Sequence, residues 1–364
     1  MDTLSIYLHI PFCRHRCAYC DFNTYTGLAD LQAPYARALA LEAAQVAQLA
    51  QVAGATRPVH TLFFGGGTPS LMDPADLGHI LARLGEAYTL TRDAEVTIEA
   101  NPGTVDIAYL EQVRELGVNR LSFGMQSAIP GELTFLERAH DHRTVVEAIE
   151  LSRAAGFDNV SVDLIYGVPG QTIHSWEKSL QAALALDLEH ISLYCLTIEP
   201  GTPLHRDLRN GVFAAPDPDL AADQYELACA LLAEEGFVHY EISNWSRPGR
   251  ECRHNLTYWR NGEYLGLGAG AHGHAAGVRY SIVKQPRTYI KRMAEHRPGA
   301  YPLSAATADK NRLSITEMMS DMVITQLRLL EEGLDLDAFA DRFGREFNSV
   351  YGEEMNQLVE WGLL

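Results

Sequence analysis

The chain has 364 residues, with 29 Lys and Arg against 47 Asp and Glu, which gives a formal net charge of −18. Because proteins bind duplex nucleic acid mainly through Lys and Arg on phosphates, this balance argues against a nucleic-acid partner. No apolar run reaches the roughly 18 residues of a membrane-spanning helix, and the first residues lack the pattern of a secretory signal. We therefore expect a cytoplasmic globular protein with no integral membrane segment and with reduced cysteines.

Strand and helix patterns alternate along about the first 200 residues. Strands are expected at 5–10, 59–64, 95–100, 120–123, 159–165 and 191–196, and helices at 31–53, 74–87, 104–116, 142–155 and 174–186. Parallel strands need long crossover connections, so this alternation predicts an α/β fold with helices packed outside a parallel sheet. Six repeats fit a partial barrel as well as a flat, doubly wound sheet, and in both the ligand face is the carboxyl edge of the strands.

The pattern changes after residue 200. A loop-rich junction leads to a helix near 219–235, and then to an irregular region rich in Trp, Tyr, His and Gly that runs to about 298. A Pro, Gly and Ala stretch at 297–306 has the composition of a linker, and helical signals dominate from 311. We predict three parts, which are a core at 1–215, an accessory region at 216–300 and a small helical domain at 311–364. The last carries no catalytic motif. It is expected to be a structural cap, and packing against the barrel mouth or a partner is the alternative.

Three of the six cysteines crowd into eight residues, as Cys13, Cys17 and Cys20 in a C-x3-C-x2-C pattern. Structural zinc sites usually need four protein ligands, and His15 inside this loop suits none of the usual zinc spacings. Three thiolates with one open position instead suit a [4Fe-4S] cluster whose fourth iron is left for a small molecule. The other cysteines, Cys195, Cys229 and Cys252, are expected to be buried or incidental thiols.

With Tyr19 before the third cysteine, the loop resembles the signature of the radical S-adenosylmethionine (SAM) superfamily, C-x3-C-x-aromatic-C. The resemblance implies a (β/α)6 partial barrel with an accessory region and a C-terminal helical domain, and SAM bound to the open iron. The sequence GGGTP at 65–69, which follows a predicted strand, is similar to the branch around the oxygen-independent coproporphyrinogen III oxidases. Within that branch the resemblance implies a SAM site lined by Tyr7, Tyr19, Gly66, Gly67, Thr68, Glu99, Gln126, Arg138 and Asp163.

Two departures separate the chain from the oxidases of this branch. The oxidases carry a further cysteine where this chain has Phe22, and they have an extension before the first strand for which we expect no room here. Both features resemble the HemW-type heme chaperones. The resemblance therefore implies a chaperone that binds heme and passes it to an acceptor protein. Coproporphyrinogen III oxidation by radical SAM chemistry is the alternative, and radical SAM chemistry on another substrate stays open as a third.

A third feature is similar to the same chaperone group, namely the H-N-x-x-Y-W sequence at 254–259. Imidazole is a good axial ligand of heme iron, and neighbouring aromatic rings can pack on a porphyrin face. The resemblance implies that His254 belongs to the heme site. Cys252, His272 and His274 are alternative ligands.

Overall fold

The computed structural model describes residues 3–295 and 299–363, so positions 297 and 298 of the expected linker lie outside the described residues. Its framework is a twelve-stranded sheet with the order β12-β11-β10-β9-β1-β2-β3-β4-β5-β6-β8-β7. The first six strands in the chain are parallel neighbours in the middle of this sheet. They are β1 (Leu4–Ile10), β2 (Val59–Gly66), β3 (Leu90–Ala100), β4 (Arg120–Gln126), β5 (Val160–Tyr166) and β6 (His190–Cys195).

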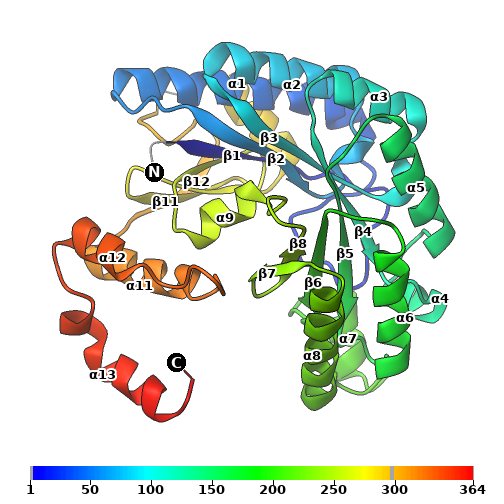
Figure 1. The fold of residues 1–364 in the computed structure, drawn as a ribbon. Helices are drawn as coiled ribbons and strands as arrows, with labels where there is room; N and C mark the ends of the chain where they lie inside the picture. Colours follow the sequence, from blue (N-terminus) through cyan, green and yellow to red (C-terminus); the bar gives the residue numbers. More distant parts are fainter. Residues whose placement is uncertain (1–2, 296–298, 364) are drawn as a thin grey trace.

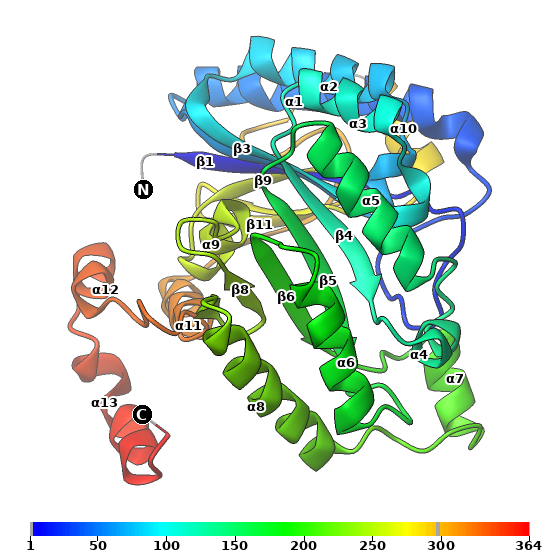
Figure 2. The same cartoon turned by 45° about the vertical axis from the view of Figure 1, so that its right-hand side comes forward.

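Helices connect these strands along the outer side of the curved sheet (Figures 1 and 2). The connections are α1 (Gln32–Val52), α2 (Pro74–Ala87), α3 (Ile107–Glu115), α4 (Pro130–Phe135), α5 (His142–Ala154) and α6 (Ile173–Leu184). Local sequence explains their limits. The Asp73 carboxylate caps α2 by accepting from the Ala75 amide, and Leu77, Ile80 and Leu84 form its buried face. The predicted partial barrel of six strand–helix repeats is confirmed.

Residues predicted to be irregular extend the sheet at both edges, so that expectation was wrong. On the β6 side, β8 (Asn244–Ser246) and β7 (Val238–Glu241) add two antiparallel strands. On the β1 side, β9 (Tyr264–Leu267) pairs in parallel with β1, and three antiparallel strands follow. These are β10 (His272–Ala275), β11 (Val278–Ile282) and β12 (Thr307–Arg312). The strands contain only three to six residues, too few to produce a clear alternating pattern.

The remaining helices are α7 (Pro203–Arg209), α8 (Pro218–Glu234), α9 (Arg253–Trp259), α10 (Pro286–Ala294), α11 (Ile315–Gln326), α12 (Leu336–Phe343) and α13 (Asn348–Glu360). Helix α9 closes the amino-terminal end of the barrel, because its side chains bond to Ser5 and Thr61 near the starts of β1 and β2. The C-terminal helices lie on this side, where α11 contacts α9 (Figure 1). They therefore do not pack at the barrel mouth, which is at the carboxyl ends of the strands. Packing against a partner and a role as a structural cap stay predictions.

The described residues contain no helix that is both long and apolar enough to cross a membrane. A large buried core lies between the sheet and the outer helices, and includes Trp176, Trp245 and Tyr35, which are at most 1% exposed. The division of the chain into three domains stays a prediction.

Candidate functional site

The carboxyl ends of the parallel strands surround a cavity of about 150 Å³. The cysteine loop follows β1, the glycine loop closes β2, and side chains from β3, β4 and β5 complete the wall. Of the site residues that the sequence predicted, the cavity is lined by Cys13, Cys17, Tyr19, Cys20, Gly66, Gly67, Thr68, Glu99, Gln126, Arg138 and Asp163. Residues spread over 150 positions thus meet where a parallel sheet places its ligands.

Backbone bonds hold the cysteine loop against β1 and β2. The Cys13 amide donates to the Tyr25 carbonyl at 3.0 Å, and the Tyr25 amide donates to Pro11 at 2.7 Å. From the next strand, the Thr68 amide donates to the Phe12 carbonyl at 2.8 Å, and the Thr68 hydroxyl lies 3.6 Å from the Cys13 sulfur. The first thiol of the loop therefore has a fixed position beside the glycine loop.

The three thiols suit an iron–sulfur cluster better than a single metal ion. Among residues 3–295 and 299–363, no three His, Cys, Asp or Glu side chains gather closely enough to hold one ion. A [4Fe-4S] cluster binds each thiolate on a different iron, so its ligands stand farther apart. Burial, followed by smaller effects of the neighbouring thiols, raises the pKa of Cys13 and Cys20. A bound cationic centre would favour their thiolate forms.

The glycine loop and β3 meet inside the cavity. The Gly66 amide donates to the Glu99 carboxylate at 2.9 Å, and Gly66 has a φ of 113°, which favours glycine. A Cβ on Gly66 would lie 2.4 Å from the His9 ring. Burial, and then the negative charge of Asp163, raise the pKa of Glu99 to about 7. Glu99 is thus a carboxyl group poised to change charge near neutral pH.

The opposite wall is built on an irregularity between β4 and β5. The strand register shifts between Gly124 and Gln126, and Gln126 has a φ of 65°, which is rare for residues other than glycine. Such strained bulges often aim side chains into functional sites. Arg138 donates to the Gly124 carbonyl at 2.8 Å and to the Cys17 sulfur at 3.4 Å. A Cβ on Gly124 would come within 3.0 Å of the Arg138 guanidinium.

The charges of this cavity match those of SAM. Two acidic side chains, Glu99 and Asp163, can take a cationic group or ribose hydroxyls, and Arg138 can pair with a carboxylate. The Nε atom of Arg138 is buried without a protein partner, so the guanidinium retains an unused donor. Burial raises the pKa of Asp163, although hydrogen bonds from Ser192 and Ser122 oppose this shift. The residues present therefore fit SAM and a cluster held by three thiolates.

A second cavity of about 330 Å³ continues from the first. It shares Tyr19, Glu99 and Asp163 with the first cavity and adds an apolar wall. This wall includes Ile165, Tyr194, Cys195 and Leu196, and Phe22 lines both cavities. Cys195 is exposed, whereas Cys252 is fully buried and Cys229 is half-buried. Tyr194 and Cys195 were not among the predicted site residues, although they end β6 on the carboxyl edge of the sheet.

Other cavity residues were also missed, namely Thr24, Asn101 and Ser122. The positions of two of them in the sequence could have indicated the site. Asn101 follows β3 directly, and Ser122 lies two residues before Gly124 on β4. Polar residues at these positions face the carboxyl end of a parallel sheet, which is the usual ligand face.

Two predicted residues do not line the cavity. Tyr7 lies beneath it, where its hydroxyl bonds to His9 Nδ1 at 3.0 Å, and burial raises the pKa of the phenol. His254 lies deeper, is 1% exposed and has hydrogen bonds at both ring nitrogens. In this structure neither nitrogen is free to bind iron, so the conformation does not fit the expected heme ligand. Of the alternative ligands, Cys252 and His274 are buried and His272 is exposed.

Comparisons with known proteins give the family and the fold. The family described as the radical SAM superfamily matches residues 7–183, and the HemN C-terminal domain matches residues 313–364. In fold, the chain is similar to the Escherichia coli coproporphyrinogen III oxidase HemN, with a TM-score of 0.83 and 24% identity over 99% of this chain and 83% of that one. The matched family and the fold thus define a radical SAM protein.

The curated relatives are more specific. The chain is 41% identical over 337 residues to the heme chaperone HemW of Mycobacterium tuberculosis (strain H37Rv), covering 92% of this chain and 84% of the relative. It is 35% identical over 362 residues to the heme chaperone HemW of Bacillus subtilis (strain 168), covering 99% and 92%. The chain belongs to the HemW heme chaperone family.

Proposed function

We propose that this chain is a heme chaperone, which binds one heme and transfers it to an acceptor protein. The observation that carries the proposal is the similarity to proteins named heme chaperone HemW, which reaches 41% identity and covers 92% to 99% of the chain in two relatives. Phe22 supports the same choice, because the oxidases resembled by the sequence have a cysteine at that position.

We also propose that Cys13, Cys17 and Cys20 hold a [4Fe-4S] cluster and that the adjoining cavity binds SAM. When bound, the cluster supplies an open iron for the amino and carboxylate groups of SAM. Glu99 and Asp163 would accept hydrogen bonds from the ribose hydroxyls or ammonium group, and Arg138 would pair with the carboxylate. The Gly66 and Gly67 backbone would approach the methionyl part closely. Gln126 and Tyr19 would contact the remaining polar and aromatic parts of SAM.

A hemin titration tests the chaperone function. Cluster-reconstituted full-length protein should bind hemin saturably, near one per chain, with a shifted Soret band. The heme should then move to an apo-hemoprotein, and size-exclusion chromatography would follow the transfer. Absence of binding at micromolar hemin would contradict the proposal.

A second measurement separates the chaperone from an oxidase. The protein would be incubated anaerobically with coproporphyrinogen III, SAM and a reductant, and the porphyrins analysed after oxidation. We expect no turnover, because Phe22 replaces the additional cysteine of the oxidases. Protoporphyrinogen formed at enzymatic rates would overturn our choice in favour of the oxidase.

A further inference from the structure

The imidazole of His254 is fixed between two hydroxyl groups. Its Nδ1 lies 2.8 Å from the Thr61 hydroxyl, and its Nε2 lies 2.8 Å from the Tyr258 hydroxyl. The Thr61 hydroxyl donates its only hydrogen to Ser5 at 2.7 Å, so it must accept from His254 Nδ1. Nε2 therefore accepts the hydrogen of Tyr258. The lone pair that an iron ligand would need is already used inside the protein.

The start of α9 is anchored to β3 as well. The amides of Arg253 and His254 each donate to the Glu95 carboxylate at 3.1 Å, so a side chain from another element caps this short helix. Burial lowers the pKa of His254 to about 3, and His60 and Arg120 act in the same direction. The imidazole is therefore neutral, and its one donor and one acceptor are both satisfied.

An aromatic stack connects this buried histidine to the floor of the SAM cavity. The His254 ring lies on Phe63 with centroids 5.0 Å apart and planes at 28°. Phe63 in turn lies on Tyr7, at 6.1 Å and 26°. A Cβ on Gly65 would come within 2.9 Å of Phe63 and 3.0 Å of Tyr7. The two rings thus support Gly65, the residue directly before Gly66, whose amide bonds to Glu99.

We propose that His254 is a positioning residue of the SAM cavity and not an axial ligand of heme. Acting through Phe63 and Tyr7, it sets the position of the glycine loop that receives SAM. This inference rests on the proposed binding of SAM and heme. In this proposal the H-N-x-x-Y-W segment lies at the amino-terminal end of the barrel and supports the cavity from below.

His254→Phe is the direct test, because it keeps a flat ring on Phe63 but removes both hydrogen bonds and cannot ligate iron. In cluster-reconstituted full-length protein, we expect the hemin stoichiometry and Soret position of the unaltered protein. SAM affinity, measured by calorimetry, should fall roughly tenfold as the floor shifts. Loss of hemin binding with unchanged SAM affinity would overturn the proposal and make His254 a heme ligand.

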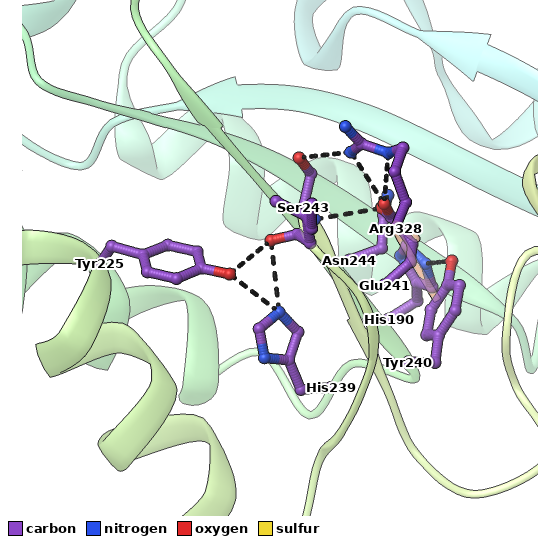
Figure 3. Close-up of polar contacts among 9 residues, drawn as sticks. His190, Tyr225, His239, Tyr240, Glu241, Ser243, Asn244 and Arg328 are labelled. Carbon is purple, nitrogen blue, oxygen red and sulfur yellow. Dashed lines mark hydrogen bonds and ion pairs between the residues drawn. The ribbon is translucent and has the colours of Figure 1, made fainter. Parts of the chain in front are cut away.

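His190→Phe is the matched control. His190 is also fully buried, with both ring nitrogens 2.8 Å from hydroxyls, those of Ser161 and Tyr240. Figure 3 shows its contact with Tyr240. It lies on β6, away from Phe63 and Gly65, so its loss should lower stability without weakening SAM binding. An equal loss of SAM affinity in this control would show a general folding defect and contradict the specific role of His254.

Phe63→Leu keeps the test decisive if His254→Phe does not fold. It breaks the middle of the stack but leaves the His254 side chain and its two hydrogen bonds in place. We expect weaker SAM binding and unchanged hemin binding, whereas unchanged SAM affinity would contradict the positioning role. If the unaltered protein binds no hemin, the proposed chaperone function fails, and the SAM measurements still decide whether His254 positions the cavity.

Discussion

The Gly66 amide donates a 2.9 Å hydrogen bond to the Glu99 carboxylate, which joins the glycine loop of β2 to the end of β3. Burial and the negative charge of Asp163 raise the pKa of Glu99 to about 7. At a pH between the ordinary pKa of a glutamate and 7, Glu99 therefore takes up a proton when the protein folds. The folded state then binds more protons than the unfolded state, so the contribution of Glu99 to stability falls as the pH rises through this window.

We predict that SAM affinity rises with pH as Glu99 ionises. A cationic ligand favours the carboxylate, and the ionised fraction grows about tenfold between pH 6 and pH 8 for a pKa of about 7. Calorimetry in buffers of different ionisation enthalpy should detect release of up to one proton per SAM below pH 7. In Glu99→Gln, affinity should be lower and nearly independent of pH.

Glu42→Gln serves as the control for this pH dependence. Glu42 is fully buried in the middle of α1. It bonds to Tyr289, Ser304 and Gly268, none of which lines the cavity. It should retain the pH dependence of SAM affinity. If Glu99→Gln also retained it, another group of the cavity would be responsible and the assignment to Glu99 would be wrong.

Cys17→Ser should abolish the visible iron–sulfur absorption of reconstituted protein. A serine hydroxyl is a poor replacement for a thiolate, so one of the three ligands is lost. Absorption spectra and iron content would be compared with Cys229→Ser, which alters a half-buried thiol on α8 outside the cavity. An unchanged spectrum in Cys17→Ser would contradict the ligand assignment.

Local patterns made the central repeats predictable. Residues 74–87 were predicted as a helix and form one with the same limits, because Asp73 and Pro74 define its start and its apolar residues have helical spacing. The cavity was predictable for a related reason. Its side chains follow parallel strands, and the topology brings their carboxyl ends to one edge of the sheet.

Features that depend on distant partners could not be predicted. The short strand β9 pairs with Ser5 to Leu8 of β1, about 260 positions earlier, and nothing in its own four residues indicates that partner. His254 provides the second example. Its sequence neighbours suggest a heme ligand, yet its Nδ1 bonds to Thr61, which is 193 residues away. Only the folded chain shows that this nitrogen is occupied.

Asn23→Asp should loosen the cysteine loop. The Asn23 amide donates to the Ala269 carbonyl at 3.0 Å and to the Lys284 carbonyl at 2.9 Å, which ties the loop to the accessory strands. Aspartate has the same shape but no donors, and it places a carboxylate against two carbonyls, at a cost of about 1–3 kcal/mol. We expect several-fold faster loss of the cluster to a chelator.

The chelator experiment has a surface control in Asn210→Asp, since Asn210 is exposed after α7. This variant should lose its cluster at the rate of the unaltered protein. Equal rates for Asn23→Asp and the unaltered protein would show that the amide of Asn23 does not hold the loop.

The C-terminal helices should depend on a buried ion pair. Arg328 lies 2.8 Å from the Glu241 carboxylate, whose side chain is fully buried, and it stacks 4.2 Å above the Trp259 ring. Figure 3 shows Arg328 reaching Glu241 and Ser243. Arg328→Met would leave a buried carboxylate without its counter-ion, which costs on the order of 3 kcal/mol. We expect lower hydrogen-exchange protection at the Ile242 and Leu330 amides, which join this segment to β7.

Glu241→Gln in the Arg328→Met background separates loss of an ion pair from loss of packing. Removing the unpaired charge should restore much of the stability, because replacing both partners of a buried pair is far less costly than removing one. Arg83→Met is the exposed control, since its pair with Glu86 is solvent-accessible and contributes at most about 1 kcal/mol. If the double variant were no more stable than Arg328→Met alone, the contact of Arg328 with Trp259, and not its charge, would hold the C-terminal helices.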